Sequence, residues 1–130
     1  MPTPVVRFRL DFGRDEAVGP GKITLLEHIG RGGSLSQAAR DLKMSYRRAW
    51  QLLESVNGSF RERAVVTQKG GRGGGGASLT PFGRQLIELY RAFDAKVQAL
   101  AARSFRPLTA KVPGARRRAR AAPVRRLSER

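Results

Sequence analysis

Apolar residues recur at helical spacing between Ser34 and Val56, and they form two separate stripes. The first stripe consists of Leu35, Ala38, Ala39 and Leu42, and the second of Tyr46, Ala49, Trp50 and Leu53. Both follow the i, i+3, i+4, i+7 spacing that puts side chains on one face of an α-helix. Only Lys43-Met44-Ser45 separates the two stripes, which leaves room for a tight turn alone. The pattern predicts a helix-turn-helix, with Trp50 in the core rather than serving as a stacking platform for bases.

Polar residues mark the start of both helices and the outer face of the second. Ser34 with Gln37 three residues later forms a capping box, and Ser45 is a typical N-cap. Four polar residues remain on the outer face of the second helix when its stripe turns inward: Arg47, Arg48, Gln51 and Ser55. The plain alternative is a packed pair of helices in a small α domain, with arginines that are merely solvated.

The remaining pattern predicts one helix before this motif and a hairpin and long helix after it. Alternating apolar residues indicate a half-buried strand over Val5–Phe12, with Val6, Phe8, Leu10 and Phe12 facing inward. Before the motif, the sequence predicts a loop over 13–21 and a helix over Lys22–Gly30 capped by Gly30 or Gly32. After the motif, it predicts a helix stop at Asn57-Gly58, a strand over Ala64–Gln68, a glycine loop over Lys69–Gly76 and a strand over Ala77–Thr80. A last helix is predicted from Pro81 to about Ser104, and Pro107 ends it. Phe60 is expected to return to the core. The predicted fold class is mainly α with a small β-hairpin: a winged helix-turn-helix with a long C-terminal helix.

Charge narrows the class of partner. The 130 residues carry 26 Lys and Arg against 10 Asp and Glu, which gives a formal net charge of +16. Such an excess points to a polyanion, with nucleic acid first and an anionic membrane surface second. The absence of cysteine excludes disulfides, thiolate nucleophiles and cysteine-based zinc sites. The charged start does not fit a signal peptide and no stretch approaches about 20 apolar residues, so we expect a cytoplasmic, nucleoid-located protein with no membrane contact.

A winged helix-turn-helix is suited to double-stranded DNA. Its second motif helix fits the major groove, where each base pair presents a distinct pattern of donors and acceptors. In the wing, Lys69 and Arg72 supply positive charge, and glycines such as Gly73 let the backbone approach phosphates. The predicted DNA-binding residues are Ser34, Ser36, Ser45, Arg47, Arg48, Gln51, Ser55, Lys69, Arg72 and Gly73.

Two stretches resemble a known family. SLSQAARDLKMSYRRAWQLLESVN and KGGRGGGGASLTPFGRQLIELY are similar to the N-terminal winged helix-turn-helix domain of the molybdate-responsive, ModE-like transcriptional regulators, which is related to LysR-type DNA-binding domains. The resemblance covers about Gly21 to Phe93 and implies a dimeric, operator-binding domain. Lys43 stands where such motifs usually carry glycine, which predicts a left-handed backbone at a lysine. Family members continue into molybdate-binding modules where this chain continues into an arginine-rich tail, so direct molybdate binding is not expected.

Signals for other chemistry are weak. Residues 71–76 match G-x-G-x-x-G, but these glycines do not open directly into a helix and lack a phosphate-loop ending. His28, the single histidine, is interpreted as a surface helix residue, and Glu54 and Glu62 do not form a catalytic pair. We therefore predict a protein that is not an enzyme, with no catalytic residues, no metal site and no cofactor.

The last predicted helix carries more apolar surface than one small core needs. Its apolar stripe consists of Phe82, Leu86, Leu89, Phe93, Val97 and Leu100, and Ile87 with Tyr90 widens it. The predicted dimer contacts on this stripe are Phe82, Leu86, Leu89, Tyr90, Phe93 and Val97. At 1.5 Å per residue a helix of about 24 residues spans about 36 Å, which exceeds the body it would pack on. We predict a homodimer through this stripe, because twofold dimers read two half-sites about one turn of DNA apart. A long helix that frays at its end is the alternative.

Two other functions stay open beside a sequence-specific regulator. One is a nucleoid-associated protein that coats DNA with little sequence preference, and the other is an adaptor domain for another regulator or an acidic partner. The predicted division is a DNA-binding domain over 1–105 and a disordered basic tail over 106–130. Each part has a net charge of +8, so half of the excess charge lies in a segment that is not expected to read sequence.

Overall fold

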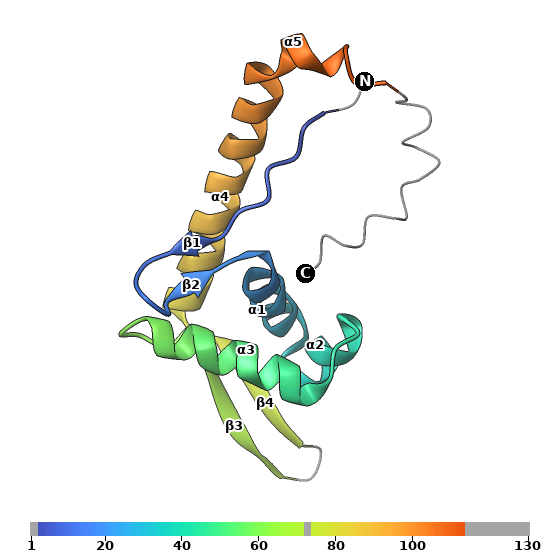
Figure 1. The fold of residues 1–130 in the computed structure, drawn as a ribbon. Helices are drawn as coiled ribbons and strands as arrows, with labels where there is room; N and C mark the ends of the chain where they lie inside the picture. Colours follow the sequence, from blue (N-terminus) through green and yellow to red (C-terminus); the bar gives the residue numbers. More distant parts are fainter. Residues whose placement is uncertain (1–2, 72–73, 114–130) are drawn as a thin grey trace. The chain divides into compact units, whose positions relative to one another are not determined.

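The computed structural model of the chain describes residues 3–71 and 74–113, without the side chain of Lys69 (Figure 1). The described part is mainly helical, with two pairs of short antiparallel strands. The elements are β1 (Leu10–Asp11), β2 (Ala17–Val18), α1 (Pro20–Gly32), α2 (Leu35–Asp41), α3 (Tyr46–Ser59), β3 (Val65–Gly71), β4 (Gly74–Leu79), α4 (Pro81–Ser104) and α5 (Arg106–Thr109). This order is compatible with the predicted mainly α class.

Contacts divide the chain into two compact units. One spans Arg7–Phe93, and the other combines Met1–Val6 with Asp94–Arg130. The division falls within α4, which is one helix of 24 residues. The predicted boundary at Phe105 stays a prediction, and residues 114–130 lie outside the described part of the chain.

The core of the Arg7–Phe93 unit lies between the first three helices and the hairpin. α1 contributes Ile23, Leu25, Leu26 and Ile29, all with no exposed area. Around them pack Ala38 and Ala39 from α2, Ala49, Leu53 and Val56 from α3, Val65 and Ala77 from the hairpin, and Leu86 and Tyr90 from α4. Phe60 packs against this cluster half-buried, as predicted. The small pair Ala38 and Ala39 leaves room for α3 to lie close to α2.

The structure differs from the prediction in the strand before α1 and in the residue that caps the end of α1. The expected strand over Val5–Phe12 is regular only at Leu10–Asp11, because its partner is a two-residue strand in the expected loop. Exposure alternates as predicted through Val6, Phe8 and Leu10, but Phe12 is 58% exposed. α1 is capped by Gly33 rather than Gly30 or Gly32: Gly33 has φ 70°, and its N–H bonds to the Ile29 carbonyl. Glycine adopts this left-handed backbone without the steric penalty of other residues.

The region after α3 also differs from prediction in its details. α3 continues through Asn57-Gly58 to Ser59, because the Asn57 side chain turns inward instead of ending the helix. The hairpin is longer than predicted, since pairing extends into the glycines as far as Gly71 and Gly74. In Figure 1 this hairpin projects beyond the three helices.

α4 begins as predicted. Thr80 Oγ1 accepts a hydrogen bond from the Gly83 N–H (2.9 Å) and donates to the Arg63 carbonyl (2.7 Å), so the start of α4 is fixed to the segment before β3. α4 ends at Ser104 as expected, but Pro107 lies within α5 rather than outside a helix. Proline is tolerated in a first helical turn because its missing N–H would have no partner there.

In the second unit, the end of α4 holds the N-terminal segment through one side chain. Gln98 accepts from the Val6 N–H and donates to the Val6 carbonyl, both at 3.0 Å. The same amide also donates to Asp94 Oδ1 at 2.9 Å. None of the described helices is long and apolar enough to cross a membrane.

Candidate nucleic-acid interface

Backbone hydrogen bonds fix the turn between α2 and α3, and a serine caps the start of each helix. Ser34 Oγ accepts from the Gln37 N–H and Ser45 Oγ from the Arg48 N–H, both at 3.0 Å. Lys43 has φ 57°, the left-handed conformation that the family resemblance implied. The next N–H, of Met44, donates to the Ala39 carbonyl at 3.0 Å. Two of the predicted DNA-binding serines therefore already use their oxygens as acceptors within the chain, which leaves their O–H groups as donors.

The outer face of α3 presents three of the predicted base-reading residues to solvent. Arg47, Arg48 and Gln51 are exposed. The opposite face is anchored by Ala49, Leu53 and Val56, each at most 2% exposed. Long polar side chains thus project from a helix whose own position is determined by the core.

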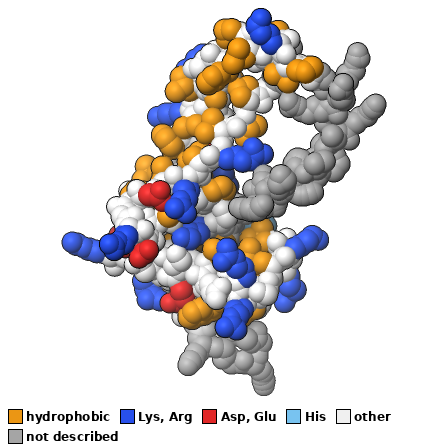
Figure 2. Space-filling model, in the orientation of Figure 1, with side chains coloured by type: hydrophobic (Ala, Val, Ile, Leu, Met, Phe, Trp, Pro, Cys, Tyr) orange, Lys and Arg blue, Asp and Glu red, His pale blue; other side chains and the backbone are white. Residues whose placement is uncertain are grey.

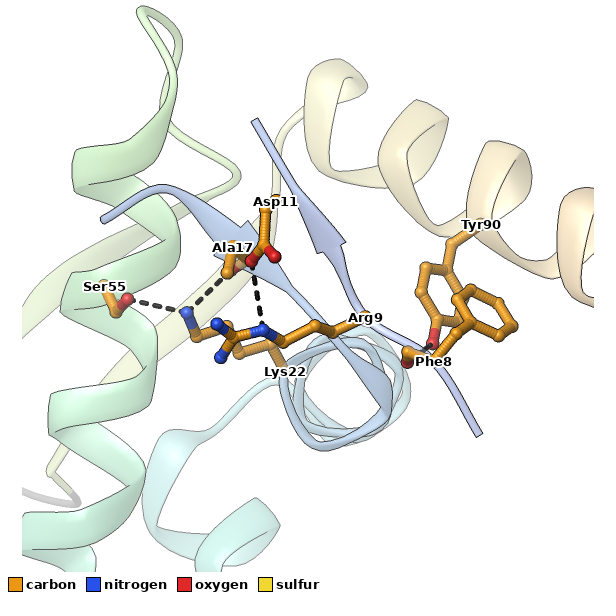
Figure 3. Close-up of polar contacts among 7 residues, drawn as sticks. All are labelled: Phe8, Arg9, Asp11, Ala17, Lys22, Ser55 and Tyr90. Atoms are coloured by element: carbon orange, nitrogen blue, oxygen red, sulfur yellow. Dashed lines mark hydrogen bonds and ion pairs between the residues drawn. The ribbon is translucent and has the colours of Figure 1, made fainter. Parts of the chain in front are cut away.

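Ser55 was predicted on the same outer face, but the structure gives it a different environment (Figure 3). It is half-buried, and its Oγ accepts a hydrogen bond from Lys22 Nζ at 2.8 Å. The same ammonium group donates to the Ala17 carbonyl at 2.8 Å. Lys22 therefore joins α1, β2 and α3, and Ser55 serves as its acceptor on α3.

Positive charge gathers around this lysine. Burial lowers the pKa of Lys22, and the nearby Arg9 and Arg48 lower it further by repulsion. Arg9 pairs with Asp11 at 3.0 Å, which offsets part of that charge (Figure 3). One edge of α3 is therefore cationic. In the sequence, Lys22 had only marked the start of a predicted helix, and no local pattern pointed to its proximity to α3.

The start of the hairpin is tied to α3 by Asn57, a buried polar residue in the last turn of that helix. Its Oδ1 accepts from the Ala64 N–H at 2.8 Å and from the Val65 N–H at 3.2 Å. Its Nδ2 donates to the Val65 carbonyl at 3.2 Å. These bonds set where β3 leaves the helical body.

A groove of about 610 Å³ lies between α3, the start of α2 and the hairpin. Its lining includes the predicted residues Ser34 and Ser36 together with Tyr46, Trp50, Thr67 and Gln68. The prediction that Trp50 packs in the core is wrong: the residue is 47% exposed, and Tyr46 is 55% exposed. Both lie at the edge of the apolar stripe, and the core takes Ala49, Leu53 and Val56 instead.

The structure describes only part of the predicted wing site. The backbone of Lys69 lies in β3. Arg72 and Gly73 lie outside the described residues. Their contact with DNA therefore stays a prediction.

The predicted dimer stripe on α4 is divided between two environments. Leu86 is 9% exposed and Tyr90 3% exposed, because both pack into the core of their own chain, and Phe82 is half-buried against it. Tyr90 stacks on Phe8 with ring centroids 5.1 Å apart (Figure 3). Leu89 remains 62% exposed and Phe93 45% exposed, while Val97 is half-buried. Leu86 and Tyr90 thus pack within their own chain, whereas Leu89 and Phe93 are exposed, and the dimer contact through this stripe stays a prediction.

Figure 2 shows lysine and arginine side chains scattered over the face in view. Asp and Glu also occur there, so the surface is not uniformly positive.

Comparison with known proteins identifies relatives of the chain. No protein-family profile matches it. The chain is 38% identical over 95 residues to the molybdenum transport protein ModE of Azotobacter vinelandii, which covers 73% of this chain and 35% of that protein. It is 45% identical over 71 residues to the DNA-binding transcriptional dual regulator ModE of Escherichia coli K12, covering 55% of this chain and 27% of that protein. The chain is a ModE homologue.

Other relatives are also named for molybdenum. The chain is 42% identical over 83 residues to the molybdenum-pterin-binding protein MopB of Rhodobacter capsulatus, covering 64% of this chain and 31% of MopB. The predicted resemblance to ModE-like regulators is thus confirmed, while the relation to LysR-type domains stays a prediction. The chain spans about a quarter to a third of the length of these relatives.

Proposed function

We propose that this chain binds double-stranded DNA as the DNA-binding part of a ModE-like transcriptional regulator. In this proposal α2 and α3 form a helix-turn-helix, β3 and β4 form its wing, and α3 enters the major groove. One observation carries the proposal: α3 is fixed by a buried face while Arg47, Arg48 and Gln51 project from the other. Arginine and glutamine can bind guanine and adenine edges through paired hydrogen bonds.

The surroundings of α3 support this orientation. When a helix lies in the major groove, its flanks face the phosphates on either side. Lys22 and Arg48 at the cationic edge are suited to one of these phosphate strands, since Lys22 is held against α3 by Ser55 and Arg48 is near enough to lower the pKa of Lys22. Lys69 and Arg72 are proposed to reach phosphates from the wing.

A homodimer through α4 would give the proposal its twofold geometry. Leu89 and Phe93 are the exposed apolar residues of the predicted stripe that remain for such a contact. Two copies of α3 would then read two half-sites about one helical turn apart. Molybdate is not expected to bind this chain directly, and none of its described residues is assigned to that anion.

A second candidate is a DNA-coating protein with little sequence preference. The observation in its favour is the distribution of charge, since half of the net +16 lies in residues 106–130. A segment of this composition neutralises phosphates on any sequence and raises affinity without selecting a site. The two candidates differ in whether any duplex is preferred over random DNA.

The test begins with selection of preferred duplexes from a random library by the full chain. We expect a preferred sequence, and Arg47→Ala and Gln51→Ala should each weaken its binding by about 1–3 kcal/mol. Binding to random DNA should change far less, because base contacts contribute little there. Competition gel shifts at two salt concentrations measure both affinities.

Arg14→Ala is the matched control, because Arg14 is exposed in the segment between β1 and β2 and carries the same charge. It should leave the preference for the selected duplex intact. Recovery of no preferred duplex would favour the coating protein. Equal losses on both kinds of DNA would show that Arg47 and Gln51 contact only phosphates.

A further inference from the structure

We propose that Trp50, supported by Tyr46, is a specificity-determining residue that contacts the methyl group of a thymine in the major groove. The inference rests on the proposed function, since it assigns a ligand to one edge of the proposed recognition helix. Three observations support it: the exposure of Trp50 and Tyr46, their position on α3, and the residues that line the groove between α3 and the hairpin.

The exposure of these two residues has no internal explanation. Trp50 is 47% exposed and Tyr46 55% exposed, although both belong to the apolar stripe of α3. The core is complete without them, because Ala49, Leu53 and Val56 already fill the buried face. Two large aromatic side chains four residues apart therefore form an apolar patch at the surface, the kind of feature that marks an interaction site.

Their position places this patch beside the proposed base-reading residues. On an α-helix, residues three and four apart are neighbours, so Trp50 adjoins Arg47 and Tyr46 on one side and Glu54 on the other. Arg47 and Glu54 are both exposed, and their opposite charges leave this edge without the net positive charge that attracts a phosphate. The opposite edge, with Arg48 and Lys22, has the charge that a phosphate needs. The aromatic edge is thus suited to an uncharged group at the base edges.

The groove next to the patch has room for such a group. It measures about 610 Å³ and is bounded on the hairpin side by Thr67, Gln68, Gly75 and Gly76. The two glycines have no side chains to fill it. The Thr67 hydroxyl and the Gln68 amide on the hairpin side can hydrogen-bond to a polar, hydrated neighbour. The rings of Tyr46 and Trp50 form the apolar wall of the groove.

Thymine is the base that exposes an apolar group in the major groove. Its C5 methyl distinguishes it from the other bases by contact with apolar side chains. An indole face beside an arginine would combine this contact with a hydrogen bond to an adjacent base. The chemistry therefore points to a thymine next to a base that Arg47 or Gln51 reads.

The experiment uses the full chain and the highest-affinity duplex selected from a random library. Each thymine in turn is replaced by deoxyuridine, which removes only the methyl group. We expect one or two replacements per half-site to weaken the wild-type chain about threefold to fourfold, which is the effect of losing one buried methyl-sized group. Trp50→Ala should bind the selected duplex more weakly and lose this discrimination at one thymine. Trp50→Phe should retain part of it.

Trp50 also provides a direct signal, because it is the only tryptophan in the chain. Its emission should change when the selected duplex binds, and change less with the uracil duplex. Phe12→Ala is the matched control, since Phe12 is 58% exposed and its ring packs on Phe60 away from the groove. That variant should discriminate between thymine and uracil as the wild type does.

The outcomes separate the inference from the proposed function. If no duplex is preferred over random DNA, the proposed function fails and the inference falls with it. If a duplex is preferred but Trp50→Ala and Trp50→Phe keep full uracil discrimination, the inference alone is overturned. Loss of self-association in a folded Trp50→Ala variant, without a change in DNA preference, would instead assign the patch to a second copy of the chain.

Discussion

Asn57 connects the proposed recognition helix to the wing through one side chain. Its three hydrogen bonds to Ala64 and Val65 use both the amide oxygen and the amide nitrogen, at only 9% exposure. Lys43, by contrast, adopts the left-handed backbone in a turn where its side chain stays exposed. Single residues thus position the proposed interface in two different ways, one by bonding across the core and one by backbone conformation.

Replacement of Asn57 by Leu should destabilise the protein by about 1–3 kcal/mol or more. The variant leaves the buried Ala64 and Val65 N–H groups without their acceptor, which has a larger effect than loss of an average hydrogen bond. Urea unfolding measures the change. Ser59→Ala, which removes one bond from Ser59 Oγ to the Ser55 carbonyl, is the control and should change stability by at most about 0.5 kcal/mol. Similar stabilities for the two variants would contradict the assigned importance of Asn57.

At the scale of whole elements, the first turn of α4 packs against the segment that leads into β3. A Cβ placed at Gly83 would collide with the Ala64 carbonyl oxygen and approach its carbon to 3.0 Å. Thr80 joins the same two elements by donating to the Arg63 carbonyl. This close approach matters for the site because Ala64 is also held by Asn57, so α4, β3 and α3 meet at one backbone segment.

Gly83→Ala should therefore destabilise the protein by about 1–3 kcal/mol, since the obstructing atoms belong to backbone that cannot rotate away. Gly21→Ala is the matched control, because an added Cβ at this helical position meets no atom within 4 Å. It should leave stability unchanged or raise it by up to about 1 kcal/mol, since alanine restricts the unfolded chain. Thermal unfolding of both variants tests the packing. An unaffected Gly83→Ala protein would show that α4 does not lie this close to β3.

At the scale of the whole molecule, DNA binding in the proposed function would depend on association of two copies of the chain and on its total charge. α4 exposes Leu89 and Phe93, whereas Leu86 and Tyr90 of the same stripe are buried in their own chain. A partner would cover the exposed pair and would bring a second basic surface to the DNA. In the proposed function, the net charge of +16 would raise affinity for any sequence, while α3 would select the site.

Leu89→Asp should weaken self-association by at least about tenfold, because a carboxylate would lose its hydration in an apolar contact. Ala95→Asp is the control: this residue is exposed on the other side of α4 and receives the same charge. Sedimentation equilibrium over a range of concentrations measures the dissociation constants. A wild-type chain that stays monomeric at all concentrations, or equal effects of the two substitutions, would contradict a dimer through this stripe.

The sequence predicted those features that depend on residues close together in the chain. The caps at Ser34, Ser45 and Thr80 require a hydroxyl near an N–H two or three residues away, and all three were predicted and are observed. The bounds of α4 follow from Pro81 and from an uninterrupted helical pattern. The left-handed backbone at Lys43 was implied by the family resemblance, because Lys43 stands where such motifs usually carry glycine, and it is observed.

Tertiary structure decided which side of each apolar stripe is covered. Periodicity gives the direction of a stripe but not its width, so Trp50 and Tyr46 at one edge of α3 were assigned to the core although the neighbouring elements do not extend over them. Asn57 bonds to residues 7–8 positions away, and Lys22 bonds to Ser55, 33 positions away. The local spacing of residues in the sequence does not reveal either contact. Local hydrogen bonding thus fixed the elements, whereas burial depended on packing between distant segments. That packing leaves Trp50 and Tyr46 exposed at one edge of the proposed interface and holds Lys22 at the other.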